Sequence, residues 1–134
     1  ATWMEPIFDN LEYLLSINKR PNLKNVDQVF KERYMEVEAV TYIRGRSLPS
    51  QFIVIDEAQN LTPHEIKTIV SRAGANSKVV LTGDPEQIDN MYLDANSNGL
   101  SYLVEAFKGE PLFGHITLQK TERSELAELA ARLL

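Results

Sequence analysis

FIVIDEAQ, at residues 52–59, is the stretch that decides the expected fold of this chain. It begins with four consecutive apolar residues, Phe52–Ile55, and then changes abruptly to acids and an amide. A short, wholly apolar run of this kind is typical of a strand that is buried on both faces of a parallel sheet. In such sheets ligands bind beyond the carboxyl ends of the strands. The polar residues that follow each apolar run are therefore the first candidates for a functional site.

A helix is predicted shortly after this strand. Thr62 is a favourable N-cap, Pro63 suits the first helical turn, and Glu65 completes a capping box. An apolar stripe at helical spacing follows, formed by Ile66, Ile69, Val70 and Ala73. Gly74 is expected to end this helix.

The rest of the chain continues the alternation of strands and helices. The apolar run Val79–Leu81 predicts a second buried strand, and a polar loop runs from Gly83 to about Asn98. Further helices are predicted over about 7–18, after Pro21, over 100–107 and over 126–133, and further strands over Val37–Ile43 and His115–Leu118. Such alternation builds a parallel sheet covered by helices. Since 134 residues suffice for one compact domain, residues 1–134 are assigned to a single α/β domain.

The composition is that of an ordinary globular chain with a modest acidic excess. Its net charge of -5 argues against a broad basic surface for nucleic acid, although a local basic groove is compatible with it. The chain has no cysteine, which excludes disulfides and thiolate metal sites. It contains no apolar run of the roughly 18 residues that a membrane span requires. It also begins without a secretory signal. We therefore expect a cytoplasmic protein without a membrane partner.

The acids after the first strand match the Walker B pattern of ATPases. Four apolar residues followed by Asp56-Glu57 place two carboxylates at a strand end. The first carboxylate would hold Mg²⁺ through water, and the second would deprotonate the attacking water. The alternative is a surface turn in which Asp56 and Glu57 are ordinary solvated acids.

A second polar motif follows the second strand. Thr82-Gly83-Asp84-Pro85-Glu86-Gln87 contains the pattern Gly-Asp-x-x-Gln, which resembles motif III of superfamily 1 helicases. In that motif Gln87 would read the γ-phosphate and the attacking water, and Asp84 would belong to the nucleotide site. The alternative is a plain turn, because glycine, aspartate and proline are turn formers. Two such motifs in this order, with a helix between them, support each other.

Arg123 follows the predicted strand His115–Leu118 and resembles motif IV of the same helicases. A planar guanidinium suits the neutralisation of charge on a transferred phosphoryl group. The alternative is that Arg123 merely lies at the start of the last helix, where the helix dipole disfavours a cation.

Together these segments resemble the C-terminal part of the ATPase domain of PhoH-like proteins. The matching segments are residues 3–14, 42–47, 52–69, 72–74, 80–89, 92–100 and 113–134. The resemblance implies a RecA-like P-loop NTPase fold, which is a three-layer sandwich with a parallel sheet. It implies ATP and Mg²⁺ as ligands and RNA as a partner, with remodelling or unwinding of RNA as the coupled activity. Some family members carry an N-terminal PIN-type ribonuclease domain. A single ATPase core of this kind would complete its site in a homo-oligomeric ring, with Arg123 acting on a neighbouring subunit.

One part of the family pattern is missing from this sequence. None of the six glycines lies in a G-x-x-x-x-G-K-[ST] phosphate-binding loop. The sandwich is therefore expected to be incomplete on its Walker A side, and the chain alone is expected not to hydrolyse ATP.

Two alternatives use the same residues differently. A metal-dependent phosphodiesterase would use a two-metal cluster built from Asp56, Glu57, Asp84, Glu86, Asp89 and Asp94. A non-catalytic docking module would carry these acids only as surface turns. Arg44 and Arg46 flank Gly45, where they would contact phosphate or RNA or would form a solvated turn.

Overall fold

A computed structural model describes residues 4–17, 25–43, 45–120 and 122–134. The chain divides into two compact units, Ala1–Arg44 and Gly45–Leu134. No helix in the described residues is both long enough and apolar enough to cross a membrane.

The described residues of the first unit form three α-helices: α1 (Glu5–Ile17), α2 (Val26–Lys31) and α3 (Val40–Ile43). Asn25 caps α2, and its side chain accepts a hydrogen bond of 2.8 Å from the backbone N–H of Gln28. The rings of Phe8 and Phe30 meet edge to face, with 5.3 Å between their centroids. This aromatic contact and the buried Val29 hold α1 against α2.

The prediction of a strand over Val37–Ile43 is wrong. Residues 35–39 have no regular structure, and Val40–Ile43 forms the short helix α3. The prediction relied on β-branched and aromatic residues, whose strand preference depends on packing against a paired strand. No strand in the described residues pairs with this segment. Tyr42 is 75% exposed, so burial does not favour an extended backbone here either.

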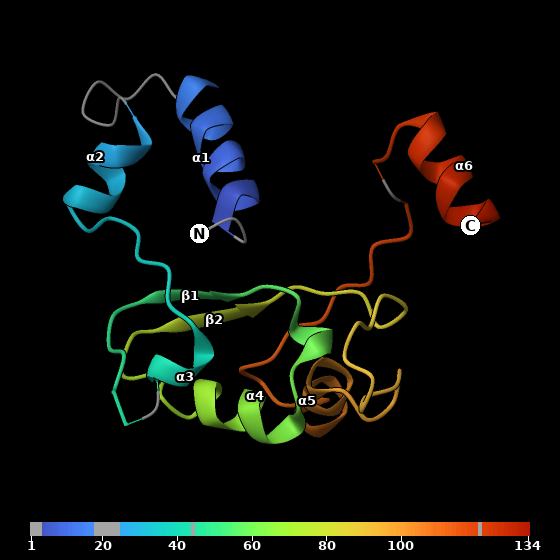
Figure 1. Ribbon diagram of the computed structural model, residues 1–134. Coiled ribbons are helices and arrows are strands. Elements are labelled where there is room, and N and C mark those ends of the chain that lie inside the picture. Colours follow the sequence, from blue (N-terminus) through green and yellow to red (C-terminus); the bar gives the residue numbers. More distant parts are fainter. Residues whose placement is uncertain (1–3, 18–24, 44, 121) are drawn as a thin grey trace. The chain divides into compact units, whose positions relative to one another are not determined.

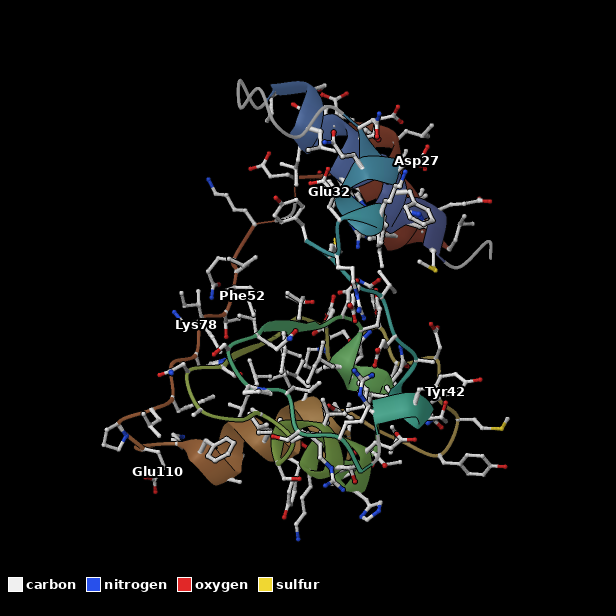
Figure 2. The ribbon with its side chains drawn as sticks, turned by 90° about the vertical axis from the view of Figure 1, so that its left-hand side faces the viewer. Asp27, Glu32, Tyr42, Phe52, Lys78 and Glu110 are labelled. Atoms are coloured by element: carbon white, nitrogen blue, oxygen red, sulfur yellow. The ribbon has the colours of Figure 1, made fainter. Side chains whose placement is uncertain are left out.

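The second unit is built on two parallel strands, β1 (Phe52–Ile55) and β2 (Lys78–Leu81). Their register pairs Phe52 with Lys78 at one end, which Figure 2 labels, and Ile55 with Leu81 at the other. Both strands were predicted from their apolar runs, and their parallel pairing confirms the expected sheet direction. The carboxyl ends of the two strands therefore lie side by side.

Helix α4 (Pro63–Val70) connects the two strands. It begins with the predicted capping box: Thr62 Oγ1 accepts from the Glu65 N–H at 3.1 Å, and Glu65 Oε2 accepts from the Thr62 N–H at 2.8 Å. The helix ends at Val70 and not at Gly74, because the next residues pair with another segment. The Leu48 N–H donates to the Arg72 carbonyl and the Gly74 N–H donates to the Leu48 carbonyl, at 2.8 and 3.0 Å.

The remaining elements are the 3-10 helix η2 (Ala58–Asn60), α5 (Gly99–Phe107) and α6 (Glu125–Leu133). Figure 1 shows α4 and α5 on the same side of the two-stranded sheet. The buried apolar side chains of this unit are Ile55, Ala58, Ile66, Ile69 and Leu103. They fill the space between the sheet, η2 and the two helices.

The expectation that β1 is buried on both faces is wrong for this unit. Phe52 is 69% exposed and Val54 57% exposed, whereas Ile55 is buried. Alternate residues of a strand point to opposite faces. Since α4 and α5 cover only the face of Ile55, the face that carries Phe52 and Val54 stays open.

The strand predicted over His115–Leu118 is also absent. These residues have no regular structure, and Ile116 and Leu118 are each more than four-fifths exposed. An extended segment becomes a strand only when a neighbour accepts its backbone hydrogen bonds, and β2 pairs only with β1 in the described chain. The last helix is confirmed as α6, with Ser124 as its N-cap. Its leucines, Leu126, Leu129 and Leu133, are exposed.

Gly99 allows a close approach between the start of α5 and the start of α4. Its N–H donates to the Leu61 carbonyl at 2.7 Å. A Cβ at this position would overlap Ile66 and would lie 2.8 and 2.9 Å from the carbonyl oxygens of Leu61 and Thr62. Two of these neighbours are backbone atoms that cannot move without disturbing the cap of α4.

Gly99→Ala is therefore expected to lower the free energy of unfolding by about 1–3 kcal/mol. Gly114→Ala is the matched control, because its Cβ would meet no atom within 4 Å. Its effect should stay within about 0.5 kcal/mol. Urea unfolding of both variants measures the difference, and equal stabilities would contradict the tight packing at Gly99.

Candidate functional site

The carboxyl ends of β1 and β2 bring the two predicted motifs together. Beyond the last strand pair, the Thr82 N–H donates to the Ile55 carbonyl and the Ala58 N–H donates to the Thr82 carbonyl, both at 3.0 Å. These bonds extend the parallel ladder past the strands. As a result, Asp56 and Thr82 leave the sheet next to each other.

Asp56 is fixed by two hydrogen bonds to one of its oxygens. Its Oδ1 accepts from the Thr82 hydroxyl at 2.6 Å and from the Glu57 N–H at 3.0 Å. Its Oδ2 accepts no hydrogen bond from the described residues, and the residue is exposed. One oxygen therefore orients the carboxylate, and the other is available to a ligand.

Glu57 has a left-handed backbone, with φ 53 and ψ 38. This conformation is uncommon for a residue with a side chain and is found most often at turns and functional sites. It turns the chain sharply from β1 into η2, so that Asp56 and Glu57 lie at the strand end and Ala58 and Gln59 enter the core. The Glu57 carboxylate accepts a short hydrogen bond from the Gln59 side chain.

Gln59 is the residue that the sequence analysis missed. Its side chain is completely buried, and it connects both motifs. The amide nitrogen donates to Glu57 Oε2 and, at 3.1 Å, to the carbonyl of Gln87. The amide oxygen accepts from the Asp84 N–H at 3.2 Å. The signal in the sequence was an amide two residues after the acid pair, which could equally have been a surface residue of the turn.

The Asp84–Gln87 turn is closed by its own side chains. Asp84 Oδ1 accepts from the Glu86 N–H at 2.9 Å, and Asp84 Oδ2 accepts from Gln87 Nε2 at 2.7 Å. The Gln87 N–H donates to the Asp84 carbonyl at 3.0 Å. The predicted Gly-Asp-x-x-Gln motif is therefore a compact turn in which Asp84 orients the Gln87 amide.

The loop beyond Gln87 is anchored by Asn60. Its Oδ1 accepts from the N–H groups of Asp89 and Asn90, at 2.8 and 3.2 Å. The Asn90 side chain donates to the Asn60 carbonyl at 3.3 Å. Gln59 and Asn60 thus attach consecutive parts of the polar loop to the end of β1.

The end of the polar loop is held by Asn98, which is fully buried and caps α5. Its amide donates to the carbonyls of Asp94 and Ala95, and its Oδ1 accepts from the Ser101 N–H. Asp94 Oδ1 accepts from the N–H groups of Asn96 and Ser97, both at 2.8 Å. These backbone donors, Asn96 first, lower the pKa of Asp94.

The other predicted residues do not join this site in the described chain. No group of three or more histidines, aspartates and glutamates that could hold a metal is found in the described residues. Arg123 is exposed, and no hydrogen bond or ion pair among the described residues holds its side chain. Arg46 is exposed as well, and Arg44 lies outside the described residues.

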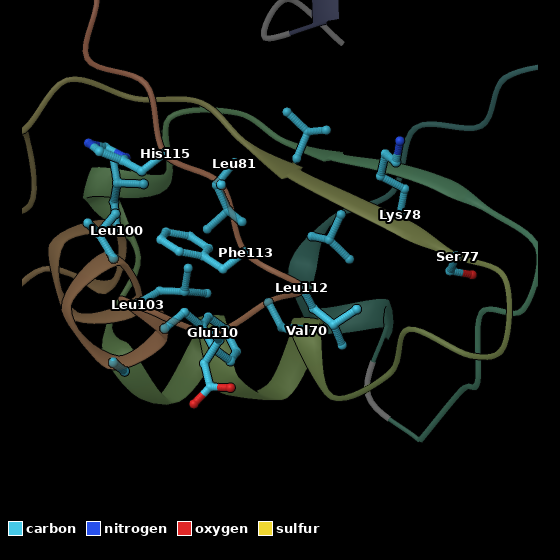
Figure 3. A pocket seen from close by; sticks show the side chains of 16 residues that line it. Val70, Ser77, Lys78, Leu81, Leu100, Leu103, Glu110, Leu112, Phe113 and His115 are labelled. Carbon is cyan, nitrogen blue, oxygen red and sulfur yellow. The ribbon is translucent and has the colours of Figure 1, made fainter.

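A cavity of the second unit lies elsewhere, between β2 and α5 (Figure 3). Its volume is about 770 Å³, and Leu81, Leu103 and Phe113 are among its mostly apolar lining residues. None of Asp56, Glu57, Asp84 or Gln87 lines it. We therefore place the candidate site at the strand ends, where the polar side chains converge, and not in this cavity.

The fold and site define a small α/β unit whose parallel strands end in an acid pair and a Gly-Asp-x-x-Gln turn. The family model of PhoH-like proteins matches residues 1–133, so this chain belongs to the PhoH-like family. It is 58% identical over 132 residues to Protein PhoH2 of Bacillus subtilis and 42% identical to Protein PhoH2 of Mycolicibacterium smegmatis. Each match covers 98% of this chain and 29% of the relative. A PhoH-like protein of Bacillus subtilis is 30% identical, over 90% of this chain and 35% of the relative. The chain thus spans about a third or less of the length of these relatives.

The two-stranded parallel sheet is consistent with part of a P-loop NTPase-like domain, and the complete RecA-like sandwich stays a prediction.

Asp94 gives the site region a pH-dependent element that can be measured. Because its pKa is lowered in the folded state, the contribution of Asp94 to stability is fully present above the ordinary aspartate pKa of 3.8 and is lost as the pH falls through the lower folded pKa. Asp94→Asn cannot lose a charge in this range. The melting temperature of the wild type should therefore exceed that of Asp94→Asn at pH 6, and the difference should shrink below about pH 4. A difference that is constant from pH 6 to pH 3 would contradict the assignment.

Proposed function

We propose that this chain supplies the Walker B and motif III part of an ATP-hydrolysing site in a PhoH-like ATPase that remodels or unwinds RNA. The observation that carries the proposal is the hydrogen-bonded connection between the two strand ends. Asp56 contacts Thr82, and Gln59 links Glu57 to the Asp84–Gln87 turn. A metal-binding acid, a water-activating acid and a phosphate-sensing amide are thereby held on one edge of a parallel sheet, where ligands bind in such folds.

The residues at this edge fit a magnesium ion. Mg²⁺ in phosphoryl-transfer sites takes one or two carboxylates together with water and substrate phosphates. Asp56 offers one oriented carboxylate with a free Oδ2, and the neighbouring Thr82 hydroxyl can also contact a coordinated water. The bound ion would supply the positive charge that neutralises the β- and γ-phosphates.

Glu57 is assigned the role of general base. It is exposed, so water can reach its carboxylate, and Gln59 orients that carboxylate through Oε2. Glu57 would accept a proton from the water that attacks the γ-phosphate. Asp84 holds the Gln87 amide through the nitrogen, which leaves the Gln87 side-chain oxygen free to orient the same water.

The remaining assignments depend on the rest of the ATPase. ATP would require a phosphate-binding loop, which residues 1–134 do not contain, so the isolated chain should not turn over ATP. Arg123 is assigned to a neighbouring subunit's γ-phosphate in a homo-oligomeric ring. Its guanidinium is exposed and has no ion-pair partner among the described residues, which is compatible with contact to another molecule.

The two-metal phosphodiesterase is disfavoured by the way the acids are used. Both oxygens of Asp84 and one oxygen of Asp94 accept hydrogen bonds from N–H groups of their own turns. The acids of the proposed cluster do not converge as a group of three or more in the described residues. The docking module remains as the second candidate, since Phe52 and Val54 form an exposed apolar face on β1.

Glu57→Gln tests the general base in a full-length protein that carries this chain. ATP turnover, with and without single-stranded RNA, should fall by about 10²–10⁴-fold, because the amide cannot accept the proton. Mg·ATP binding should persist, since Asp56 is unchanged. Glu86→Gln is the matched control, as Glu86 is an exposed acid of the same loop whose side chain makes no hydrogen bond in the described chain. Normal turnover by Glu57→Gln would refute the proposal.

Arg123→Ala tests whether the site is completed by a neighbouring subunit. An arginine that stabilises the transferred phosphoryl group contributes about 10³–10⁵-fold in turnover. Arg123→Ala and Glu57→Gln should each be inactive alone in the full-length protein. When the two are mixed and exchange subunits, some interfaces combine an intact Glu57 with an intact Arg123, and activity should return. A mixture that stays inactive at every ratio, with exchange verified, would exclude action on a neighbour.

A further inference from the structure

The buried carboxamide of Gln59 makes three hydrogen bonds, more than the side chain of any residue assigned to the chemistry makes in the described chain. It contacts the Glu57 carboxylate, the Asp84 N–H and the Gln87 carbonyl at the same time. The first partner belongs to the strand end of β1, and the other two belong to the turn after β2. Gln59 is also 0% exposed, so no water replaces these contacts when they break.

Two local features show that the chain is built around this amide. Gly83 has no side chain, and a Cβ there would collide with Gln59 Oε1 and lie 3.0 Å from Leu100 Cδ2. The left-handed backbone of Glu57 turns Ala58 and Gln59 into the core. Leaving a buried amide without its partners is costly, so the Glu57 carboxylate and the turn after β2 constrain the position of Gln59 together.

We propose that Gln59 is a positioning residue that makes the orientation of Glu57 depend on the Asp84–Gln87 turn. The proposal rests on the ATPase function assigned above, and it adds regulation within that site. When the turn is in place, the Asp84 N–H and the Gln87 carbonyl fix the Gln59 side chain. The Gln59 amide nitrogen then donates to Glu57 Oε2. If Gln87 moves with the state of the γ-phosphate, Gln59 must follow, and Glu57 loses its orienting donor.

The test compares two buried substitutions with a neighbouring control in a full-length protein that carries this chain. Gln59→Glu keeps an acceptor for the Asp84 N–H and removes the donor to Glu57. Gln59→Met removes every hydrogen bond without adding a charge. Asn60→Asp is the matched control, because the Asn60 side chain acts only as an acceptor and the aspartate can keep both bonds.

Both Gln59 variants should lower kcat for ATP hydrolysis by about 10²-fold, the effect expected of a catalytic group displaced by about 1 Å. The KM for Mg·ATP should change by less than about threefold, because the binding groups are untouched. Asn60→Asp should keep kcat within about threefold of wild type. Melting temperatures identify which variants are folded. A folded Gln59 variant with normal kcat, or one in which KM rises while kcat stays constant, would overturn the proposal.

A double-mutant comparison separates positioning from general destabilisation. If Gln59 acts through Glu57, then Glu57→Gln combined with Gln59→Met should turn over ATP within about threefold of Glu57→Gln alone. Losses that multiply would mean that Gln59 acts independently of Glu57, which would overturn the proposal. If instead Glu57→Gln itself remains active, the proposed ATPase function fails. If Glu57→Gln is inactive but the Gln59 variants remain active, the ATPase function is supported and the proposed role of Gln59 in orienting Glu57 is refuted.

Discussion

The hydrogen bonding of the fully buried Gln59 amide is the constraint on which the strand-end site depends. A buried amide must keep its hydrogen-bond partners, because an amide that is removed from water without other partners costs free energy. The partners of Gln59 come from both strand ends, so the turn after β2 cannot shift without affecting the residues after β1. The parallel pairing of Ile55 with Leu81 brings the two ends together, and Gln59 then fixes their detailed geometry.

The parts of the fold that could be predicted are those whose sequence signal is local. Three predictions needed only the residues of the segment itself, and all three are confirmed. They are the strands at Phe52–Ile55 and Val79–Leu81 and the capping box at Thr62. The strand predictions at Val37–Ile43 and His115–Leu118 failed because a strand exists only with a partner. Composition can favour an extended backbone, but pairing is a long-range property that these segments do not encode. The single domain assigned to residues 1–134 stays a prediction.

The site was predictable to a similar extent. Asp56, Glu57, Asp84 and Gln87 were chosen because they follow apolar runs, and the structure brings them to one edge of the sheet. Gln59 was missed because its role comes from burial, which depends on the left-handed turn at Glu57 and on the missing side chain of Gly83. The left-handed turn has no recognisable pattern in the sequence, and Gly83 was recognised only as part of the Gly-Asp-x-x-Gln motif and not as the space that Gln59 occupies. Arg123 stays a prediction, since its proposed partner would be another molecule.

The hydrogen bonding of the carboxylate oxygens at this edge of the sheet favours a single-metal ATPase site over a two-metal phosphodiesterase site. A two-metal centre needs several carboxylates that can release their existing partners, yet Asp84 and Asp94 each close a turn with backbone N–H groups. A single-metal ATPase site needs one oriented carboxylate with an available oxygen, which Asp56 provides through Oδ2. It also needs a second acid that is oriented but open to water, which describes Glu57. Asp84 and Asp94 therefore maintain the loop, whereas Asp56 and Glu57 lie at the strand end with carboxylates that solvent can reach.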